Sequence, residues 1–150
     1  MLLNIAIAAF MMVVTTAIHA GGMVLVLRMI RFLEGCRGRL RPRFLRSRIY
    51  WLVGTVLLMF LVSVLEVLAW AATYLALNAI QGFEQALYFS TVTFTTLGYG
   101  DIVIDEHWRL LASFEATNGI IMFGLTTAIV VAAVQRIYRK EYMGDADNKQ

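Results

Sequence analysis

Residues 86–101 read ALYFSTVTFTTLGYGD, and this stretch decides the fold. It carries no charge before Asp101, so it is too apolar for a solvated loop. From about Glu84 to Thr95 the chain can form three helical turns, which reach only about 18 Å and cannot cross a bilayer. Non-helical backbone at membrane depth must be buried in protein or line a watery cavity. The stretch therefore predicts a re-entrant helix followed by a buried LGYG segment, rather than the ordinary turn that paired glycines often mark.

The composition of the whole chain is that of a membrane protein. Of the 150 residues, 60% are hydrophobic and 15% are charged, and the mean hydropathy is +0.72. A soluble domain is typically about 45–50% apolar and about 25% charged. A single cysteine, Cys36, excludes a disulfide-stapled secreted scaffold, and a single proline, Pro42, excludes a proline-rich disordered chain.

Three other segments are long and apolar enough to span a bilayer, which needs about 20 such residues in a helix. Residues 1–27 carry no Asp, Glu, Lys or Arg, residues 49–83 carry only Glu66, and residues 110–135 carry only Glu115. We therefore predict an all-α membrane protein with transmembrane helices over residues 2–30, 49–79 and 107–139. A cleaved signal peptide is the alternative for the first segment, but the segment lacks a basic n-region.

The charges predict how these helices are oriented. Eight arginines crowd the connection between the first two helices, and three basic residues follow the third, so both regions are expected in the cytoplasm. Residues 80–107 hold four acids and no Lys or Arg, which places them outside with the N-terminus. The chain is thus predicted to lie in the cell membrane with a cytoplasmic C-terminus. The basic residues are Arg28, Arg31, Arg37, Arg39, Arg41, Arg43, Arg46, Arg48, Arg136, Arg139 and Lys140.

The segment TTLGYGD, residues 95–101, resembles the selectivity filter of the tetrameric potassium channels. The likeness extends back through residues 88–94, which are similar to a pore helix, and forward to Trp108 and Gly119. It implies a pore domain over residues 49–139 with an outer helix, a pore helix, a filter and an inner helix. Residues 1–30, a basic cytoplasmic loop or interfacial helix at 31–48 and a short cytoplasmic tail at 140–150 lie outside this resemblance.

The chemistry of such a filter can be argued from the residues. A dehydrated K⁺ ion needs rings of carbonyl oxygens in place of its water, so successive carbonyls must point to one axis. Gly98 and Gly100 can adopt the positive φ that this arrangement requires. Each chain supplies one strand, so fourfold rings imply a homotetramer. The predicted K⁺ ligands are in Thr96, Leu97, Gly98 and Tyr99, with Gly100 completing the filter; K⁺ is the permeant ion, and no cofactor is expected.

The pore helix is expected to support this filter. Its C-terminal end near Thr95 directs a partial negative charge at the cavity below. Tyr88, Phe89 and Phe94 are predicted to brace the side chains of Leu97 and Tyr99, and Thr93 belongs to the same helix. At the outer mouth, acids repeated four times would concentrate cations. Asp101 directly follows the filter, and the other acids, which can equally belong to a solvated loop, are Glu84, Asp105 and Glu106.

One face of the third helix is predicted to line a cavity below the filter. Its members recur at spacings of three and four residues, as on a helical face, although a packing stripe has the same spacing. Gly119 matches the glycine that the resembled family uses as a gating hinge, but a small residue also lets membrane helices pack closely. The predicted face comprises Ile120, Phe123, Thr127, Val131 and Gln135.

Two acids lie inside predicted spans and are candidate buried acids. Glu66 and Glu115 lie at comparable depths, so we expect them to share a proton or to bond hydroxyl groups of the pore helix such as those of Thr91 or Thr93. Snorkelling toward the outer interface is the alternative. His19, near the middle of the first helix, is either a neutral histidine bonded within the bundle or a proton sensor.

The arginine-rich connection does not predict a voltage sensor, which needs Arg at every third position of an apolar helix. Here Arg37, Arg39, Arg41 and Arg43 are spaced by two and interrupted by Gly38 and Pro42. Contact of residues 37–48 with anionic lipid headgroups is the expectation, and a topology signal alone is the alternative.

The sequence therefore favours a potassium-selective channel. A non-selective cation pore and a non-conducting membrane interaction subunit remain as alternatives. An enzyme is not expected, since no nucleophile paired with a base, metal-ligand cluster or phosphate-binding loop is apparent. The expected partners are lipid and further copies of the chain, and nucleic acid is not expected to be one. Docking of a further partner on the first helix is left open.

Overall fold

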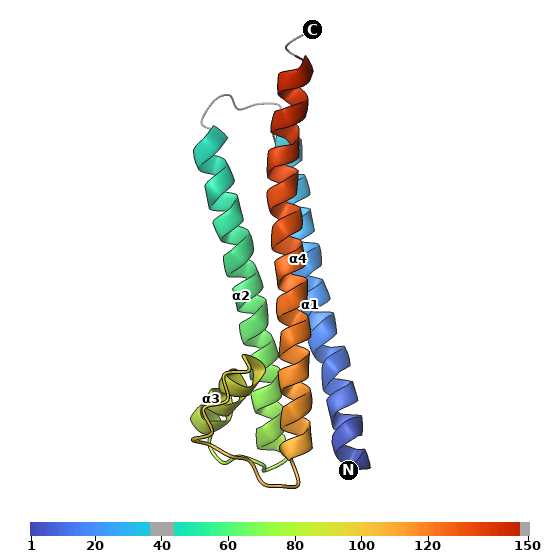
Figure 1. Ribbon diagram of the computed structural model, residues 1–150, viewed down its shortest axis with the longest axis vertical. Coiled ribbons are helices and arrows are strands. Elements are labelled where there is room, and N and C mark those ends of the chain that lie inside the picture. The colour runs from blue at the N-terminus through green and yellow to red at the C-terminus, as the bar shows by residue number, and fades with distance from the viewer. Residues whose placement is uncertain (37–43, 148–150) are drawn as a thin grey trace.

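Four helices make up the computed structural model, which describes residues 1–36 and 44–147, with side chains described for residues 1–29, 31–32 and 50–135. They are α1 (Leu2–Cys36), α2 (Phe44–Ala76), α3 (Phe83–Phe94) and α4 (Arg109–Asp147). The three long helices lie side by side, and the short α3 packs beside one end of α2 (Figure 1). The N-terminus lies at the same end as α3, and the C-terminus lies at the other (Figure 1). The predicted all-helical class is confirmed.

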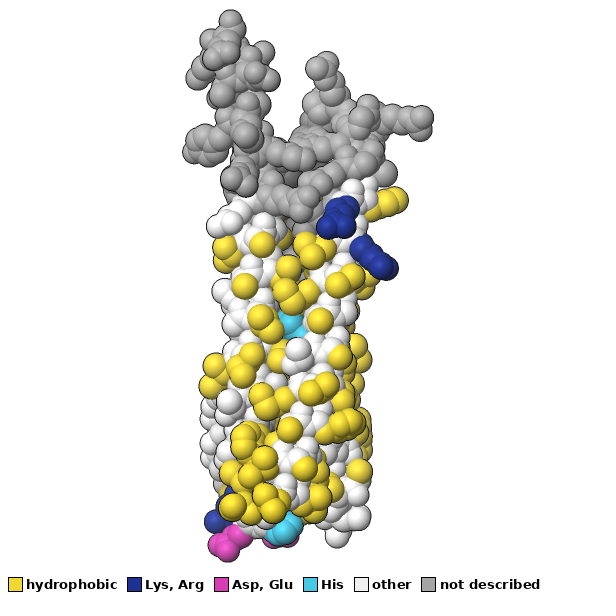
Figure 2. Space-filling view, turned by 90° about the vertical axis from the view of Figure 1, so that its right-hand side faces the viewer, with side chains coloured by type: hydrophobic (Ala, Val, Ile, Leu, Met, Phe, Trp, Pro, Cys, Tyr) yellow, Lys and Arg dark blue, Asp and Glu magenta, His cyan; other side chains and the backbone are white. Residues whose placement is uncertain are grey.

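Three of these helices are long and apolar enough to cross a membrane, over Leu2–Met29, Tyr50–Ala76 and Arg109–Gln135. On the visible face, hydrophobic side chains cover the region between basic side chains on one side and acidic side chains at the end that holds α3 (Figure 2). Exposed large apolar side chains on such helices face lipid, where they cost nothing.

The connection between the first two spans is shorter than predicted. Helix α1 continues to Cys36 and α2 already begins at Phe44, because the residues at these ends include good helix formers such as Arg, Leu and Glu. The predicted lipid contacts of residues 37–48 lie outside the described side chains. The side chains of Arg136, Arg139 and Lys140, predicted to lie in the cytoplasm, are also outside the described ones.

Two local signals place α3 at the end of α2. Helix α2 ends at Ala76, Asn78 just beyond it has φ 52°, and the Ala79 N–H donates to the Tyr74 carbonyl at 2.9 Å. A left-handed residue that follows a helix in this way satisfies its last carbonyl groups. Gly82, at φ 93°, then precedes the first residue of α3, so the chain turns back within a few residues.

The core lies where α2, α3 and α4 meet. Trp70, Tyr74, Phe94 and Leu111 are fully buried there. The Tyr74 and Phe89 rings pack edge to face with centroids 5.2 Å apart, an arrangement that aromatic pairs prefer. This core fixes α3 against the two spans that precede and follow it.

Helix α1 is attached to α2 and α4 by buried polar contacts. The Asn118 amide of α4 donates to Thr15 Oγ1 at 2.8 Å, and His19 Nδ1 lies 2.9 Å from Glu66 Oε1 of α2. Near the N-terminus the Asn4 amide donates to the His107 carbonyl. Polar side chains that bond across helices stabilise membrane bundles by about 0.6 kcal/mol each on average.

Gly119 lies where α4 approaches the end of α3 most closely. A Cβ atom at this position would collide with the carbonyl group of Phe94, which is backbone and cannot rotate away. The residue is buried and does not face a cavity. Close packing against α3, the second of the two roles predicted for Gly119, is therefore what the structure shows. A part of Gly119 in gating stays a prediction.

We expect Gly119→Ala to lower the free energy of unfolding by about 1–3 kcal/mol, the usual cost of overpacking. Gly124→Ala is the matched control on the same helix, since nothing lies within 4 Å of a Cβ there. Denaturant titration in detergent micelles, followed by helix content, measures both. Equal stability of the two variants would contradict the close contact.

Candidate functional site

The backbone between α3 and α4 alternates in handedness over residues 96–100. Thr96, Gly98 and Gly100 have positive φ values of 60°, 54° and 77°. Alternation of left-handed and ordinary residues allows successive carbonyl groups to point to one side, which a regular strand does not permit. The sequence predicted the two glycines; it missed Thr96, whose signal is its position two residues before Gly98.

The start of this segment is tied to α3. The N–H groups of Leu97 and Gly98 both donate to the Val92 carbonyl, at 3.0 and 3.2 Å, and the Thr96 N–H donates to the Thr93 carbonyl at 2.9 Å. The end of the helix thus satisfies the first backbone donors of the segment. Backbone groups at membrane depth require such internal partners.

The far end of the segment is tied to α3 by a side chain. The Tyr88 hydroxyl donates to Asp101 Oδ2 at 2.6 Å, and the Ile102 N–H donates to Asp101 Oδ1 at 3.0 Å. The bond from Tyr88 lowers the pKa of Asp101, and the same bond raises the pKa of the Tyr88 hydroxyl. Residues 97–100 are therefore held between two attachment points on one helix.

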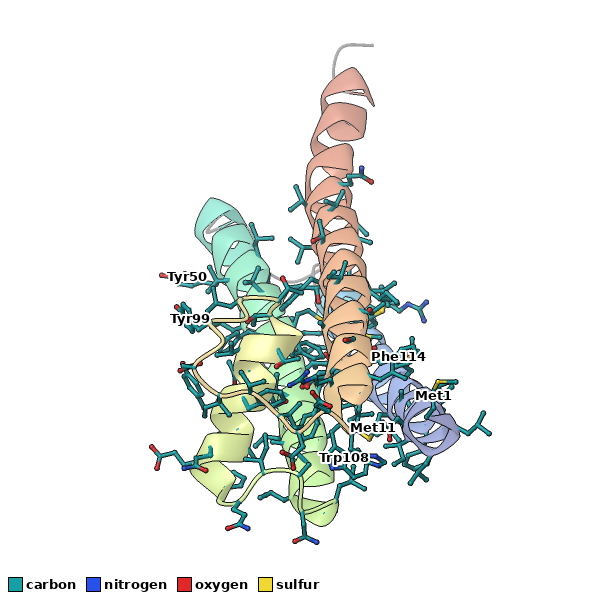
Figure 3. All side chains as sticks on the ribbon, turned by 60° about the horizontal axis from the view of Figure 1, so that its bottom comes forward. Met1, Met11, Tyr50, Tyr99, Trp108 and Phe114 are labelled. Atoms are coloured by element: carbon teal, nitrogen blue, oxygen red, sulfur yellow. The ribbon has the colours of Figure 1, made fainter. Side chains whose placement is uncertain are left out.

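Leu97 and Tyr99 extend away from the rest of their own chain. Their side chains are 55% and 67% exposed, and Tyr99 lies on the outer side of the loop, away from α1 and α4 (Figure 3). Phe94 instead packs against Phe123 of α4, with ring centroids 5.8 Å apart, and Phe89 packs against Tyr74. The prediction that Phe89 and Phe94 brace Leu97 and Tyr99 is thus corrected for a single chain, because α2 and α4 bury those rings.

A small cavity lies behind the segment. Its volume is about 230 Å³, and it is lined by parts of α3, the segment itself, residues 102–104 and the start of α4. Thr93 lines it, whereas the Thr95 hydroxyl caps its own helix by donating to the Thr91 carbonyl at 2.7 Å.

The two buried acids have separate partners. Glu66 and Glu115 are both fully buried, but Glu66 lies against His19 at 2.9 Å. Glu115 bonds Ser90 at 2.5 Å and Tyr74 at 2.6 Å. Glu115 therefore bonds a hydroxyl group of the pore helix, as predicted, but that of Ser90 rather than that of Thr91 or Thr93. For Glu66 the expectation is wrong, because the rotation of α2 turns this acid toward His19 of α1, and the two acids do not share a proton.

The predicted cavity-lining face of α4 is uncovered in a single chain. Ile120, Phe123 and Val131 are 62%, 39% and 47% exposed, and Thr127 and Gln135 are also exposed. These residues follow one another along the helix on the side that its own chain does not cover.

The end of the bundle that holds α3 carries exposed acids. Asp101, Asp105, Glu84 and Glu106 all reach solvent, and Glu106 pairs with Arg109 at 3.4 Å. Of these four acids, Asp101 directly follows the segment, and Glu106 has a basic partner.

Removing the Tyr88 hydroxyl should change the titration of Asp101. The bond lowers the pKa of Asp101 and raises the pKa of Tyr88. The stabilisation that this bond gives the folded protein is therefore fully present at pH values between the ordinary pKa values of the two groups. It is lost as pH falls through the lowered value or rises through the raised one. We expect Tyr88→Phe to return the pKa of Asp101 toward the ordinary value, as measured by NMR of the labelled carboxyl carbon. An Asp101 titration that is identical in the variant would refute the bond.

Comparison with known proteins adds one finding to this geometry. A family model described as "Ion channel" matches residues 62–136, half of the 150-residue chain. The match covers most of the α2 span, α3, the alternating segment and the α4 span, and it excludes α1. No solved structure matches the chain significantly. This protein therefore belongs to the ion-channel family and spans a membrane.

Proposed function

We propose that the protein is a potassium-selective channel and that four copies of residues 96–100 form its filter. The observation that carries the proposal is the alternation of φ at Thr96, Gly98 and Gly100. Carbonyl oxygens from Thr96, Leu97, Gly98 and Tyr99 would replace the water around K⁺. The permeant ion needs no covalent chemistry, so the chain acts as a passive conductor.

The unfilled surfaces of the single chain support a homotetramer. One chain supplies one strand, whereas a ring of carbonyl oxygens around an ion needs several. The exposed Leu97, Tyr99, Ile120 and Phe123 lie on the filter segment and on α4. In a tetramer these faces would meet the same faces of neighbouring copies, or line the water-filled cavity.

Electrostatics favour cations along this path. Helix α3 ends at Phe94, next to the filter segment, and a helix C-terminus carries about half a negative charge. Asp101 is ionised at neutral pH, and its lowered pKa extends the charged form to lower pH. Four copies would surround the outer mouth. A cation would therefore meet negative potential both above and below the filter.

The orientation follows the charges. Residues 80–107, which carry acids and no Lys or Arg, lie at the end of the bundle that holds the N-terminus. We place this end outside the cell membrane and the C-terminus in the cytoplasm. Residues 37–48 would then meet the anionic lipid headgroups of the inner leaflet.

Flux through the purified protein in liposomes tests the function. With opposed K⁺ and Na⁺ gradients, we expect K⁺ flux that drives the potential to the K⁺ equilibrium value. Equal K⁺ and Na⁺ flux would identify a non-selective pore, and absence of flux would identify a non-conducting subunit. Either result would overturn the proposal.

A single methyl group in the filter should stop conduction. Gly98→Ala places a Cβ on a residue at φ 54°, which costs an L-residue about 1–2 kcal/mol in each subunit. We expect K⁺ flux to fall at least tenfold while the tetramer persists on native mass spectrometry. Gly54→Ala on α2, where a Cβ meets nothing within 4 Å, is the control and should conduct normally.

A further inference from the structure

We infer that Glu115 is an uncharged carboxylic acid, and that it positions the pore helix by donating its proton to Ser90. Glu115 is fully buried where α2, α3 and α4 meet, and it contacts a side chain from each of the other two helices. The consequence for the filter rests on the proposed function; the protonation state does not.

The number of available protons carries the inference. Ser90 Oγ lies within hydrogen-bond distance of two oxygens, the Val67 carbonyl at 3.0 Å and Glu115 Oε1 at 2.5 Å. A hydroxyl has one proton to donate, and an ionised carboxylate can only accept. If Glu115 were ionised, one Ser90 proton would have to serve both oxygens.

An uncharged Glu115 resolves this shortage. Its Oε1 proton is donated to Ser90, which then donates its own proton to the Val67 carbonyl. The Tyr74 hydroxyl donates to the remaining oxygen, Glu115 Oε2, at 2.6 Å. Each of the three protons then has one acceptor, and both carboxyl oxygens are satisfied.

The surroundings of Glu115 provide no charge to balance an ionised form. Among the described side chains, the ion pairs are His19 with Glu66 and Arg109 with Glu106, and neither includes Glu115. Its polar neighbours are the hydroxyl groups of Tyr74 from α2 and Ser90 from α3. An isolated carboxylate in the interior of a membrane protein is far more costly than a hydrogen-bonded acid.

Glu115 acts as a positioning residue for the filter because it helps to fix α3 against α4. Glu115 and Gly119 are four residues apart on α4, and their partners Ser90 and Phe94 are four residues apart on α3. The two helices are therefore in register over one full turn, held by a hydrogen bond at one end and a backbone contact at the other. The filter segment begins two residues after Phe94, so a shift of α3 would move it.

Infrared difference spectroscopy tests the protonation state directly. The spectrum of the wild-type protein minus that of Glu115→Gln at neutral pH should contain the C=O stretching band of a protonated carboxylic acid, which shifts in heavy water. Glu66→Gln is the control for assigning the band to Glu115. This variant keeps Glu115, so its own spectrum should still contain the band. Carboxylate bands in the Glu115 difference spectrum would overturn the inference.

Ser90→Ala tests the direction of donation. Without its acceptor the acid would hold its proton in a weaker bond, so we expect the C=O band to move to higher frequency. Ser113→Ala is the matched control, because the Ser113 hydroxyl only bonds the Arg109 carbonyl at the exposed surface. An unmoved band in Ser90→Ala would refute donation to Ser90, and the wild-type spectrum stands even if that variant does not fold.

The positioning role is tested by comparing two replacements. Glutamine can donate to Ser90 and accept from Tyr74, whereas leucine can do neither, so Glu115→Leu should show K⁺ flux about tenfold or more below that of Glu115→Gln. Equal flux in the two variants would refute the positioning role. If the wild type itself carries no K⁺ flux, the proposed function fails while the infrared result still decides the state of Glu115.

Discussion

The structure depends on one constraint, which is that the non-helical backbone between α3 and α4 needs hydrogen-bond partners for its N–H groups. In a protein that spans a membrane, such partners come from the protein itself. The Val92 and Thr93 carbonyls accept the first N–H groups of the segment at residues 96–100, and Tyr88 holds Asp101 just after its far end. All of these partners belong to α3, so the short helix acts as a rigid template on which the segment between its two attachment points is fixed.

Helix α3 can hold the segment in place only if α3 is itself held in place, and a helix of 12 residues is too short to span a bilayer. Three kinds of contact hold it: the aromatic packing of Phe89 and Phe94, the hydrogen bonds of Ser90, and the backbone contact of Phe94 with Gly119. The aromatic packing depends on the shape of the rings, and the hydrogen bonds of Ser90 depend on the number of protons that the hydroxyl and carboxyl groups can donate. The backbone contact depends on the absence of a side chain at Gly119. A substitution that preserves one of them does not compensate for the loss of another.

The sequence predicted the elements well and the contacts less well, for a physical reason. Runs without charges determine which helices can lie in lipid, and the length of the 86–101 segment excludes a fourth span. Partner choice depends instead on the rotation of each helix about its axis. A rotation of one residue, about 100°, decides whether a buried acid meets Ser90 or Thr91, and depth alone does not contain that information. Likewise, the positive φ of Thr96 follows from the hydrogen bond between its N–H group and the Thr93 carbonyl. Threonine has no intrinsic preference for the left-handed conformation.

Helix α1 lies outside the region that the ion-channel family shares, yet its contacts argue against a detachable appendage. It reaches α4 through Asn118, the residue next to Gly119, and it reaches α2 through Glu66, one residue before Val67, whose carbonyl accepts from Ser90. Both attachment points are thus adjacent in sequence to residues that contact α3. Because Asn118 and Glu66 are fully buried, separation of α1 would leave two polar side chains facing lipid. The buried contacts that make α1 costly to remove are thus each one residue away in sequence from a contact that positions α3.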